Sequence, residues 1–133
     1  MKTKGLLLTA ITLLMQLVYA QVHISIDTIG KFSKTENLYV KSTSSDSLAS
    51  GFIIVIKKEV KLHKHLNHSE HVLVIEGEGQ MQLGDKTFTI KPNDLIFIPK
   101  NTPHKVITTS KKPLKVLSIQ SPNFDGKDRV MLE

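Results

Sequence analysis

The segments VKLHKHLNHSEHVLVIEGEG (residues 60–79) and PNDLIFIPKNTPHKV (residues 92–106) decide how this chain folds. The first begins with alternating apolar and polar residues, which is typical of a β-strand with one buried face. Because side chains in a strand repeat with a period of two, His63 and His65 are expected to point to the same face of a sheet. Imidazole groups are common ligands of divalent transition metals, so this face is a candidate metal site.

Outward from these segments, the chain reads as a series of short strands separated by turns that contain glycine or proline. The strongest turn signal is Gly84-Asp85, which suits a tight hairpin because glycine adopts positive φ freely. Short strands at close spacing, with no helical period, predict an all-β sandwich or barrel. Strands are expected at 21–30, 51–56, 60–65, 71–75, 80–83, 87–90, 95–98, 104–107 and 114–119. Residues 38–40 are a candidate for one further short strand.

Two polar segments lack this pattern. Residues 42–47 are rich in serine and are expected to form a loop. Residues 121–133 have no clear period, and we expect this tail to lie across the mouth of the barrel.

The first twenty residues have the features of a secretory signal peptide. Lys2 and Lys4 precede an apolar run from residue 6 to 18, and small residues follow at Val18 and Ala20. The competing interpretation is a membrane helix, but the run is shorter than the roughly 20 residues that a span requires. We therefore expect residues 1–20 to be removed, residues 21–133 to form one domain, and the protein to be periplasmic or extracellular, without stable membrane insertion.

Charge and cysteine content exclude several classes of function. The chain carries 18 basic and 12 acidic residues, and loss of Lys2 and Lys4 would leave 16 against 12, a net charge of +4. The basic residues are scattered and lack interleaved aromatic residues, so a nucleic-acid partner is not expected. With no cysteine, disulfides, thiolate chemistry and iron–sulfur clusters are excluded.

Spaced residues in the two segments form two motifs. They are His63-x-His65, Glu70 and Gly77 in the first, and Asn93, Pro99-x-Asn101 and His104 in the second. This arrangement resembles the two motifs of the cupin superfamily, and specifically its small single-domain members. The resemblance implies a single jelly-roll β-barrel. It also implies that one divalent metal ion (Mn, Fe, Zn, Ni or Cu) is held by His63, His65, Glu70 and His104, with one or two coordination positions open.

The chain departs from the family pattern at three positions. Asn93 and Asn101 stand where the family usually has glycine, and asparagine is the non-glycine residue that best tolerates left-handed backbone. We therefore expect the same turns. Thr108 stands where asparagine is frequent, at a position that is not a ligand.

Other polar residues near the motifs are not assigned to the metal. His68 and His71 are interpreted as surface residues or as residues behind the ligands, with His71 on the opposite face of its strand. Glu76 is expected to be solvated, and no catalytic residue is predicted. Cleavage before Gln21 would also place His23 third from a free amine, an arrangement that can chelate Cu(II) or Ni(II).

Three classes of function remain open. The resemblance favours a metal-dependent enzyme, such as a dioxygenase, isomerase or lyase, that acts on a small organic molecule, anionic molecules included. The alternative is a module that binds a small ligand or a metal without turnover, and a storage role ranks last. Small cupins often form homodimers by exchanging edge strands, and residues 22–26 are the predicted edge strand.

Overall fold

The computed structural model describes residues 22–133, so the predicted signal peptide lies outside the described residues. Within them the chain forms one short 3-10 helix, η1 (Ile26–Thr28), and otherwise β-strands. The strands are β1 (Leu38–Ser45), β2 (Ser50–Ile56), β3 (Glu59–His65), β4 (Ser69–Glu76), β5 (Gly79–Leu83), β6 (Lys86–Ile90), β7 (Leu95–Ile98), β8 (His104–Thr108), β9 (Leu114–Ser121) and β10 (Arg129–Met131). No helix among residues 22–133 is long and apolar enough to cross a membrane.

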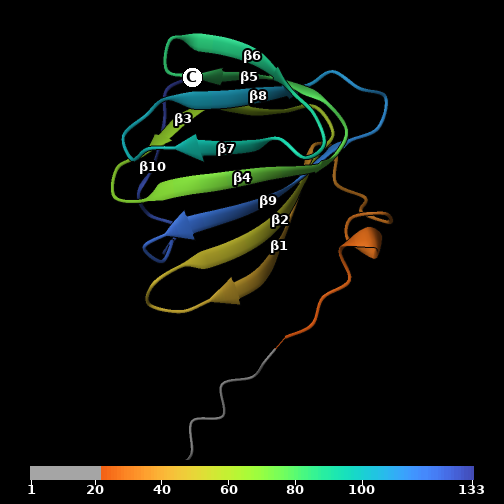
Figure 1. The fold of residues 1–133 in the computed structure, drawn as a ribbon, viewed down its shortest axis with the longest axis horizontal. Coiled ribbons are helices and arrows are strands. Elements are labelled where there is room, and N and C mark those ends of the chain that lie inside the picture. The colour runs from red at the N-terminus through yellow and green to blue at the C-terminus, as the bar shows by residue number, and fades with distance from the viewer. Residues whose placement is uncertain (1–21) are drawn as a thin grey trace, which may run out of the picture.

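The strands form two antiparallel sheets, in the orders β1-β2-β9-β4-β7 and β10-β3-β8-β5-β6. Figure 1 shows the two sheets as opposite walls of one barrel-like body. Strands far apart in the sequence are neighbours, such as β2 with β9 and β3 with β8, as expected where a jelly roll crosses between its sheets. The predicted all-β jelly roll is therefore confirmed.

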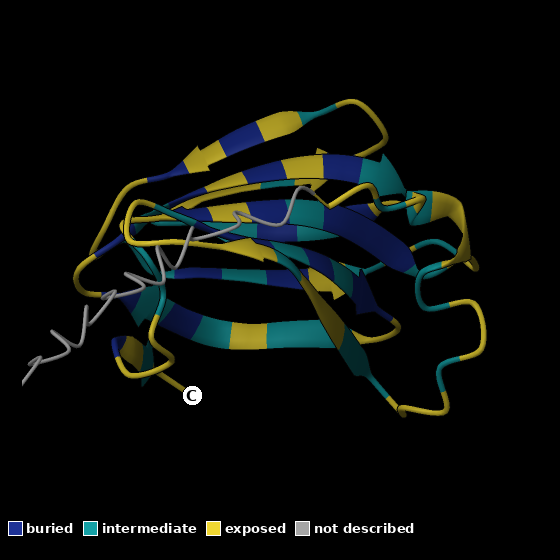
Figure 2. Ribbon diagram, turned by 90° about the horizontal axis from the view of Figure 1, so that it is seen from below, coloured by how far each residue is buried: buried dark blue, intermediate teal, exposed yellow. Residues whose placement is uncertain are grey.

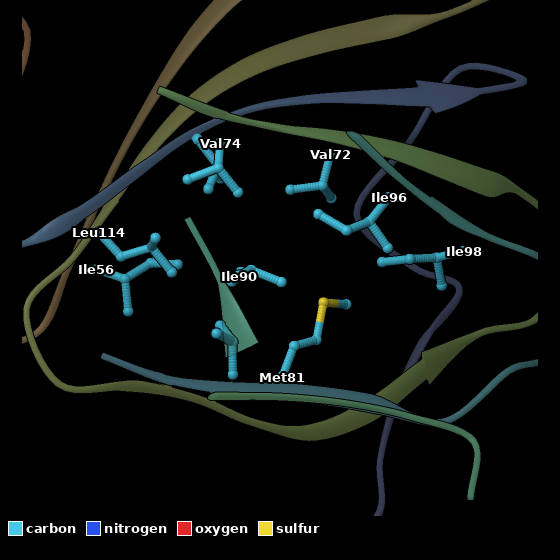
Figure 3. Close-up of a cluster of buried hydrophobic side chains, with 10 residues drawn as sticks. Ile56, Val72, Val74, Met81, Ile90, Ile96, Ile98 and Leu114 are labelled. Atoms are coloured by element: carbon cyan, nitrogen blue, oxygen red, sulfur yellow. The ribbon is translucent and has the colours of Figure 1, made fainter. Parts of the chain in front are cut away.

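The hydrophobic core lies between the two sheets. Buried and exposed residues alternate along many strands, so each sheet turns one apolar face inward (Figure 2). Figure 3 shows Val72 and Ile98 of one sheet facing Met81 of the other. Leu114 at the start of β9 is fully buried, with an exposed fraction of 0%. This packing fixes the spacing between the sheets and hence the position of any side chain that points into the barrel.

The predicted strand at 21–30 is wrong. In its described part, from Val22 on, the chain is irregular and then forms η1. Lys115 donates to the carbonyl oxygen of Ile26, and the backbone at Gly30 lies close to Val55 of β2, so this segment packs on the outside of a sheet. The alternation of apolar residues here does not reflect a strand, and Val22 is 66% exposed. A homodimer built by exchange of this strand therefore loses its basis, while the homodimer itself stays a prediction.

Strand β1 is longer than the sequence pattern indicated, and it includes most of the segment that was expected to be a loop. Lys41, Ser42 and Ser44 pair with Ile53, Phe52 and Gly51 of β2, with a register shift between the two serines. As an edge strand with mostly exposed side chains, β1 needs backbone pairing and no apolar alternation. The polar composition of residues 42–45 therefore gave no strand signal in the sequence.

Two asparagines hold left-handed turns, as predicted from the motif. The φ angle is 75° at Asn93 and 61° at Asn101. The N–H of Asn101 donates to the carbonyl oxygen of His65 at 2.5 Å. This turn therefore ties the loop before β8 to the end of β3, where two of the candidate ligands lie.

Replacing Asn101 by alanine is expected to lower the free energy of unfolding by about 1 kcal/mol, because a Cβ-bearing residue other than asparagine is strained at positive φ. Asn101→Gly is the matched control and should retain wild-type stability, since glycine adopts this conformation freely. Chemical denaturation of both variants tests this. Equal losses in both would show that the side chain, and not the backbone conformation, matters at this position.

Candidate metal centre

Three of the four predicted ligands converge on the inner face of one sheet. His63 and His65 lie two residues apart on β3, and His104 at the start of β8 is paired directly with His63. Each imidazole offers a nitrogen within 4.8 Å of the others. The exposed fractions are only 4%, 5% and 5%. The period of the strand and the pairing register together explain why residues 41 positions apart meet.

Glu70, the fourth predicted ligand, comes from the opposite sheet. It lies on β4, and its Oε2 atom is 3.8 Å from Nε2 of His65 and 3.6 Å from Nε2 of His104. Its other oxygen, Oε1, accepts a hydrogen bond from the hydroxyl of Ser118 at 2.5 Å. One carboxylate oxygen is therefore held in place while the other faces the imidazoles.

Backbone carbonyl groups determine which nitrogen of two histidines is free. Nδ1 of His63 lies 2.7 Å from the carbonyl oxygen of Lys61, and Nδ1 of His104 lies 2.9 Å from that of Thr102. Because a carbonyl oxygen can only accept, the proton of each neutral ring must sit on Nδ1. The Nε2 lone pairs are then free, and such fixed tautomers are typical of histidines that bind a metal.

The protonation states also suit a cation. Burial is the main cause that lowers the pKa of His63 to about 3, and it likewise lowers the pKa of His65 to about 4. Burial alone would raise the pKa of Glu70, but contacts with His104 and Ser118 outweigh it and bring the pKa to about 2. Near neutral pH this gives neutral imidazoles and an ionised carboxylate, which are the forms that bind a metal ion.

A second group of polar side chains lies behind His65. The carboxylate of Asp128 is 3.5 Å from Nδ1 of His65 and 2.8 Å from Nδ1 of His68, and it also accepts the N–H of Asn67 at 2.9 Å. His68 and Asp128 are buried, with exposed fractions of 3% and 8%. Asp128 therefore places a carboxylate near Nδ1 of His65, although the two atoms form no hydrogen bond in this structure.

The sequence prediction missed Asp128 and partly misplaced His68. His68 is buried beside His65, with ring centroids 4.1 Å apart, so it is not a surface residue and occupies the other predicted position, behind the ligands. Asp128 sits in a tail with no strand pattern, and no sequence signal placed it near the histidines. His71 is exposed and packs against Phe97 on the outer face, as predicted.

Replacing Asp128 by asparagine is expected to weaken metal binding by about 10- to 100-fold, the usual effect of removing the partner of a ligating histidine. The change keeps the size of the side chain and removes its charge. Titration of the variant with Zn²⁺ tests this, with thermal unfolding as a check on the fold. Asp125→Asn, at an exposed position in the same tail, is the control. Unchanged affinity in Asp128→Asn would mean that Asp128 does not support His65.

A cavity of about 190 Å³ adjoins the four predicted ligands. For scale, an engineered cavity of roughly 150 Å³ accommodates benzene. The walls are mainly apolar and include Phe52, Ile54 and Ile98. Apart from the predicted ligands, the polar residues that line the cavity are Lys105, Gln120 and Arg129. The site therefore has room for a small molecule beside the imidazoles.

The tail contributes to this cavity, in keeping with its expected place at the mouth. Phe124 lines it and contacts the rings of His65 and His68 edge-on, at centroid distances of 5.6 and 5.1 Å. Glu76, in contrast, does not line the cavity and is not simply solvated, since it pairs with Lys112 at 2.8 Å and with Lys115 at 3.4 Å.

Comparison with known proteins shows which family shares this fold and these motifs. The family model for the cupin domain matches residues 52–120. The uncharacterized protein MJ1618 of Methanocaldococcus jannaschii is 38% identical over 87 residues, which are 65% of this chain and 69% of that protein.

Two solved structures share the fold. An uncharacterized conserved protein with a double-stranded β-helix domain from Klebsiella pneumoniae has a TM-score of 0.73 at 16% identity, covering 86% of this chain and 99% of that one. A variant of Streptomyces PAC13, solved with uridine, has a TM-score of 0.66 at 16% identity, covering 76% of this chain and 82% of that one. Since the family model matches more than half of the 133 residues, the chain belongs to the cupin domain family.

Proposed function

We propose that this chain is an exported cupin that binds one divalent transition-metal ion through His63, His65, Glu70 and His104. We further propose that it acts as a metal-dependent enzyme on a small organic molecule held in the adjoining cavity. Mn, Fe, Zn, Ni and Cu all accept this set of nitrogen and oxygen ligands. The reaction is proposed only by class, as that of a dioxygenase, an isomerase or a lyase.

The observation that carries the metal proposal is the arrangement of the Nδ1 atoms. Nδ1 of His63 and Nδ1 of His104 each have a backbone carbonyl acceptor, at 2.7 and 2.9 Å. Nε2 of His65 and Nε2 of His104 lie within 4 Å of the Glu70 carboxylate. Histidines that merely pack in a core have no need of such matched tautomers, whereas histidines that bind a metal through Nε2 require them.

The chain's own residues supply the setting for chemistry. A divalent ion held by His63, His65, Glu70 and His104 would supply a Lewis acid for an oxygen atom of the substrate. The apolar walls, including Ile54 and Ile98, exclude water and so strengthen electrostatic interactions inside the cavity. Ser118 holds the orientation of Glu70 by a hydrogen bond, and Asp128 places a carboxylate 3.5 Å from Nδ1 of His65. PAC13, which has the same fold, was solved with uridine, and this supports a small organic molecule as the occupant.

The alternative is a module that binds a small ligand without turnover. One observation favours it: no histidine or carboxylate other than the predicted ligands lines the cavity among residues 22–133. An enzyme usually employs a general acid or base in addition to its metal ligands. Lys105, Gln120 and Arg129 would have to fill that role.

Elemental analysis of the purified protein, followed by assays on a panel of small molecules, tests the proposal. The expected result is about one transition-metal ion per chain and turnover that chelation removes and the same metal restores. Iron or manganese together with O₂ uptake would favour a dioxygenase. Stoichiometric metal and saturable ligand binding without turnover would favour the binding module, and a protein that binds no metal would contradict both.

Export is a separate part of this proposal. It rests on the charged and apolar pattern of residues 1–20. Amino-terminal sequencing of the protein recovered outside the cytoplasm should give Gln21 as the first residue. Recovery of intact Met1 in the cytoplasm would contradict export.

A further inference from the structure

Arg129 is a charged residue of the cavity that the metal proposal does not use. It lies on β10, an edge strand that pairs with β3, and its Cα partner is His65. Residues directly opposite one another in an antiparallel pair project to the same face of the sheet. Since His65 points into the barrel, Arg129 is directed to the same side, and it lines the cavity together with the four predicted ligands.

The guanidinium group of Arg129 has no protein partner among residues 22–133. No carboxylate lies within ion-pair distance of it, and no side-chain hydrogen bond holds it. Glu70, the buried carboxylate of the cavity, faces the imidazoles and Ser118 instead. Arg129 is an exposed residue that also lines the cavity, so its guanidinium group is open to a ligand that enters from solvent.

We propose that Arg129 binds the carboxylate group of a small, otherwise apolar molecule whose other end lies against the predicted metal ligands. This inference rests on the proposed function and names its substrate class. The planar guanidinium fork matches a carboxylate with two parallel hydrogen bonds. The walls next to it, including Phe124 and Val60, are apolar and suit the remainder of such a molecule.

A carboxylate fits this end of the cavity better than a phosphate does. The other cation that lines the cavity, Lys105, has its Nζ atom 3.7 Å from a carboxylate oxygen of Glu133. Arg129 is therefore left as the single free positive charge for a ligand. One bidentate cation matches the single charge of a carboxylate, whereas a phosphate carries more charge and more acceptor oxygens.

The test compares Arg129→Gln with the wild-type protein at equal metal content, using benzoate, benzamide and inorganic phosphate as probes in calorimetric titrations. We expect wild type to bind benzoate and to prefer it to the neutral benzamide. Arg129→Gln should lose about 10- to 100-fold in benzoate affinity, the effect of removing hydrogen bonds to a charged group. Arg129→Lys should lie between the two, because it keeps the charge and lacks the fork.

Lys127→Gln is the matched control, because it removes one positive charge from the same tail at an exposed residue that does not line the cavity. It should bind benzoate as wild type does. Equal benzoate affinity in wild type and Arg129→Gln, or no benzoate binding by wild type, would overturn the inference. Phosphate binding as tight as benzoate binding, and equally dependent on Arg129, would overturn the assignment to carboxylates.

Metal titration of the same variants separates this inference from the proposed function. Arg129→Gln should bind Zn²⁺ as wild type does, because Arg129 is not a proposed ligand. A wild-type protein that binds benzoate through Arg129 but takes up no metal would contradict the proposed function alone. A protein that binds metal but shows no role for Arg129 would contradict the inference alone.

Discussion

Replacing His65 by alanine is expected to reduce the affinity for Zn²⁺ by about 10²- to 10³-fold. Structural zinc sites with four ligands have binding free energies of roughly 10–16 kcal/mol, so each ligand contributes about 2.5–4 kcal/mol. His65 stands at the centre of the proposed site, next to Glu70 on one side and Asp128 on the other. Its loss removes one ligand and leaves both carboxylates without their shared partner.

His71→Ala is the matched control for this experiment. It also removes one imidazole from a strand that carries a predicted ligand, but His71 is exposed on the outer face of β4. Metal content after dialysis and Zn²⁺ titration should distinguish the two variants, with denaturation curves to confirm that both fold. If His65→Ala and His71→Ala retain the same metal content, the proposed ligand set is wrong.

Those parts of the fold and the candidate site that depend on local spacing could be predicted from the sequence. The period of two on β3 placed His63 and His65 on one face, and the Gly84-Asp85 signal located the hairpin between β5 and β6. Glu70 and His104 could not be placed from local spacing, because no local pattern indicates that β4 faces β3 and β8 across a barrel. The resemblance to the cupins supplied that information. The structure groups the three histidines and places the Glu70 carboxylate within 4 Å of His65 and His104.

The remaining parts depended on tertiary pairing that leaves no periodic signal. Strand β10 has only three residues, and it exists because it extends the edge of β3. Strand β1 is largely polar because most of its side chains face water, while the alternating residues 22–26 form no strand. Edge strands form through backbone pairing more than through side-chain burial. The pattern of apolar residues therefore predicts their positions poorly.

The short strand β10 gives the tail two roles at once. Because successive residues of a strand point in opposite directions, a tail that ran past the barrel without pairing could not hold neighbouring side chains at defined positions. Pairing with β3 sets Arg129 opposite His65 on the cavity side. Asp128, the residue just before β10, has its carboxylate 3.5 Å from Nδ1 of His65. The tail therefore carries both Arg129, the proposed ligand-binding residue, and Asp128, which lies beside the proposed metal ligand His65.

Acid is expected to destabilise the metal-free protein well above the pH at which carboxylates titrate. In the unfolded chain the pKa of a histidine is about 6.5, whereas burial lowers the pKa of His63 to about 3 and that of His65 to about 4. Below pH 6.5 the unfolded chain therefore binds protons that the folded protein does not. The free energy of unfolding therefore decreases as the pH decreases. The lowered pKa of Glu70, about 2 against an ordinary 4.5, adds a further loss below pH 4.5.

Between pH 7.5 and pH 5 the two histidines should together remove about 2–4 kcal/mol of stability, since each unfolded-state proton changes the free energy by about 1.4 kcal/mol per pH unit. For a domain of this size the melting temperature should fall by roughly 10 °C. Thermal unfolding in EDTA across this range measures the effect. The double variant His63→Gln/His65→Gln should lose most of it, because glutamine does not titrate, while His71→Gln should retain it. A melting temperature that does not change between pH 7.5 and 5 would mean that these imidazoles are not held neutral by burial.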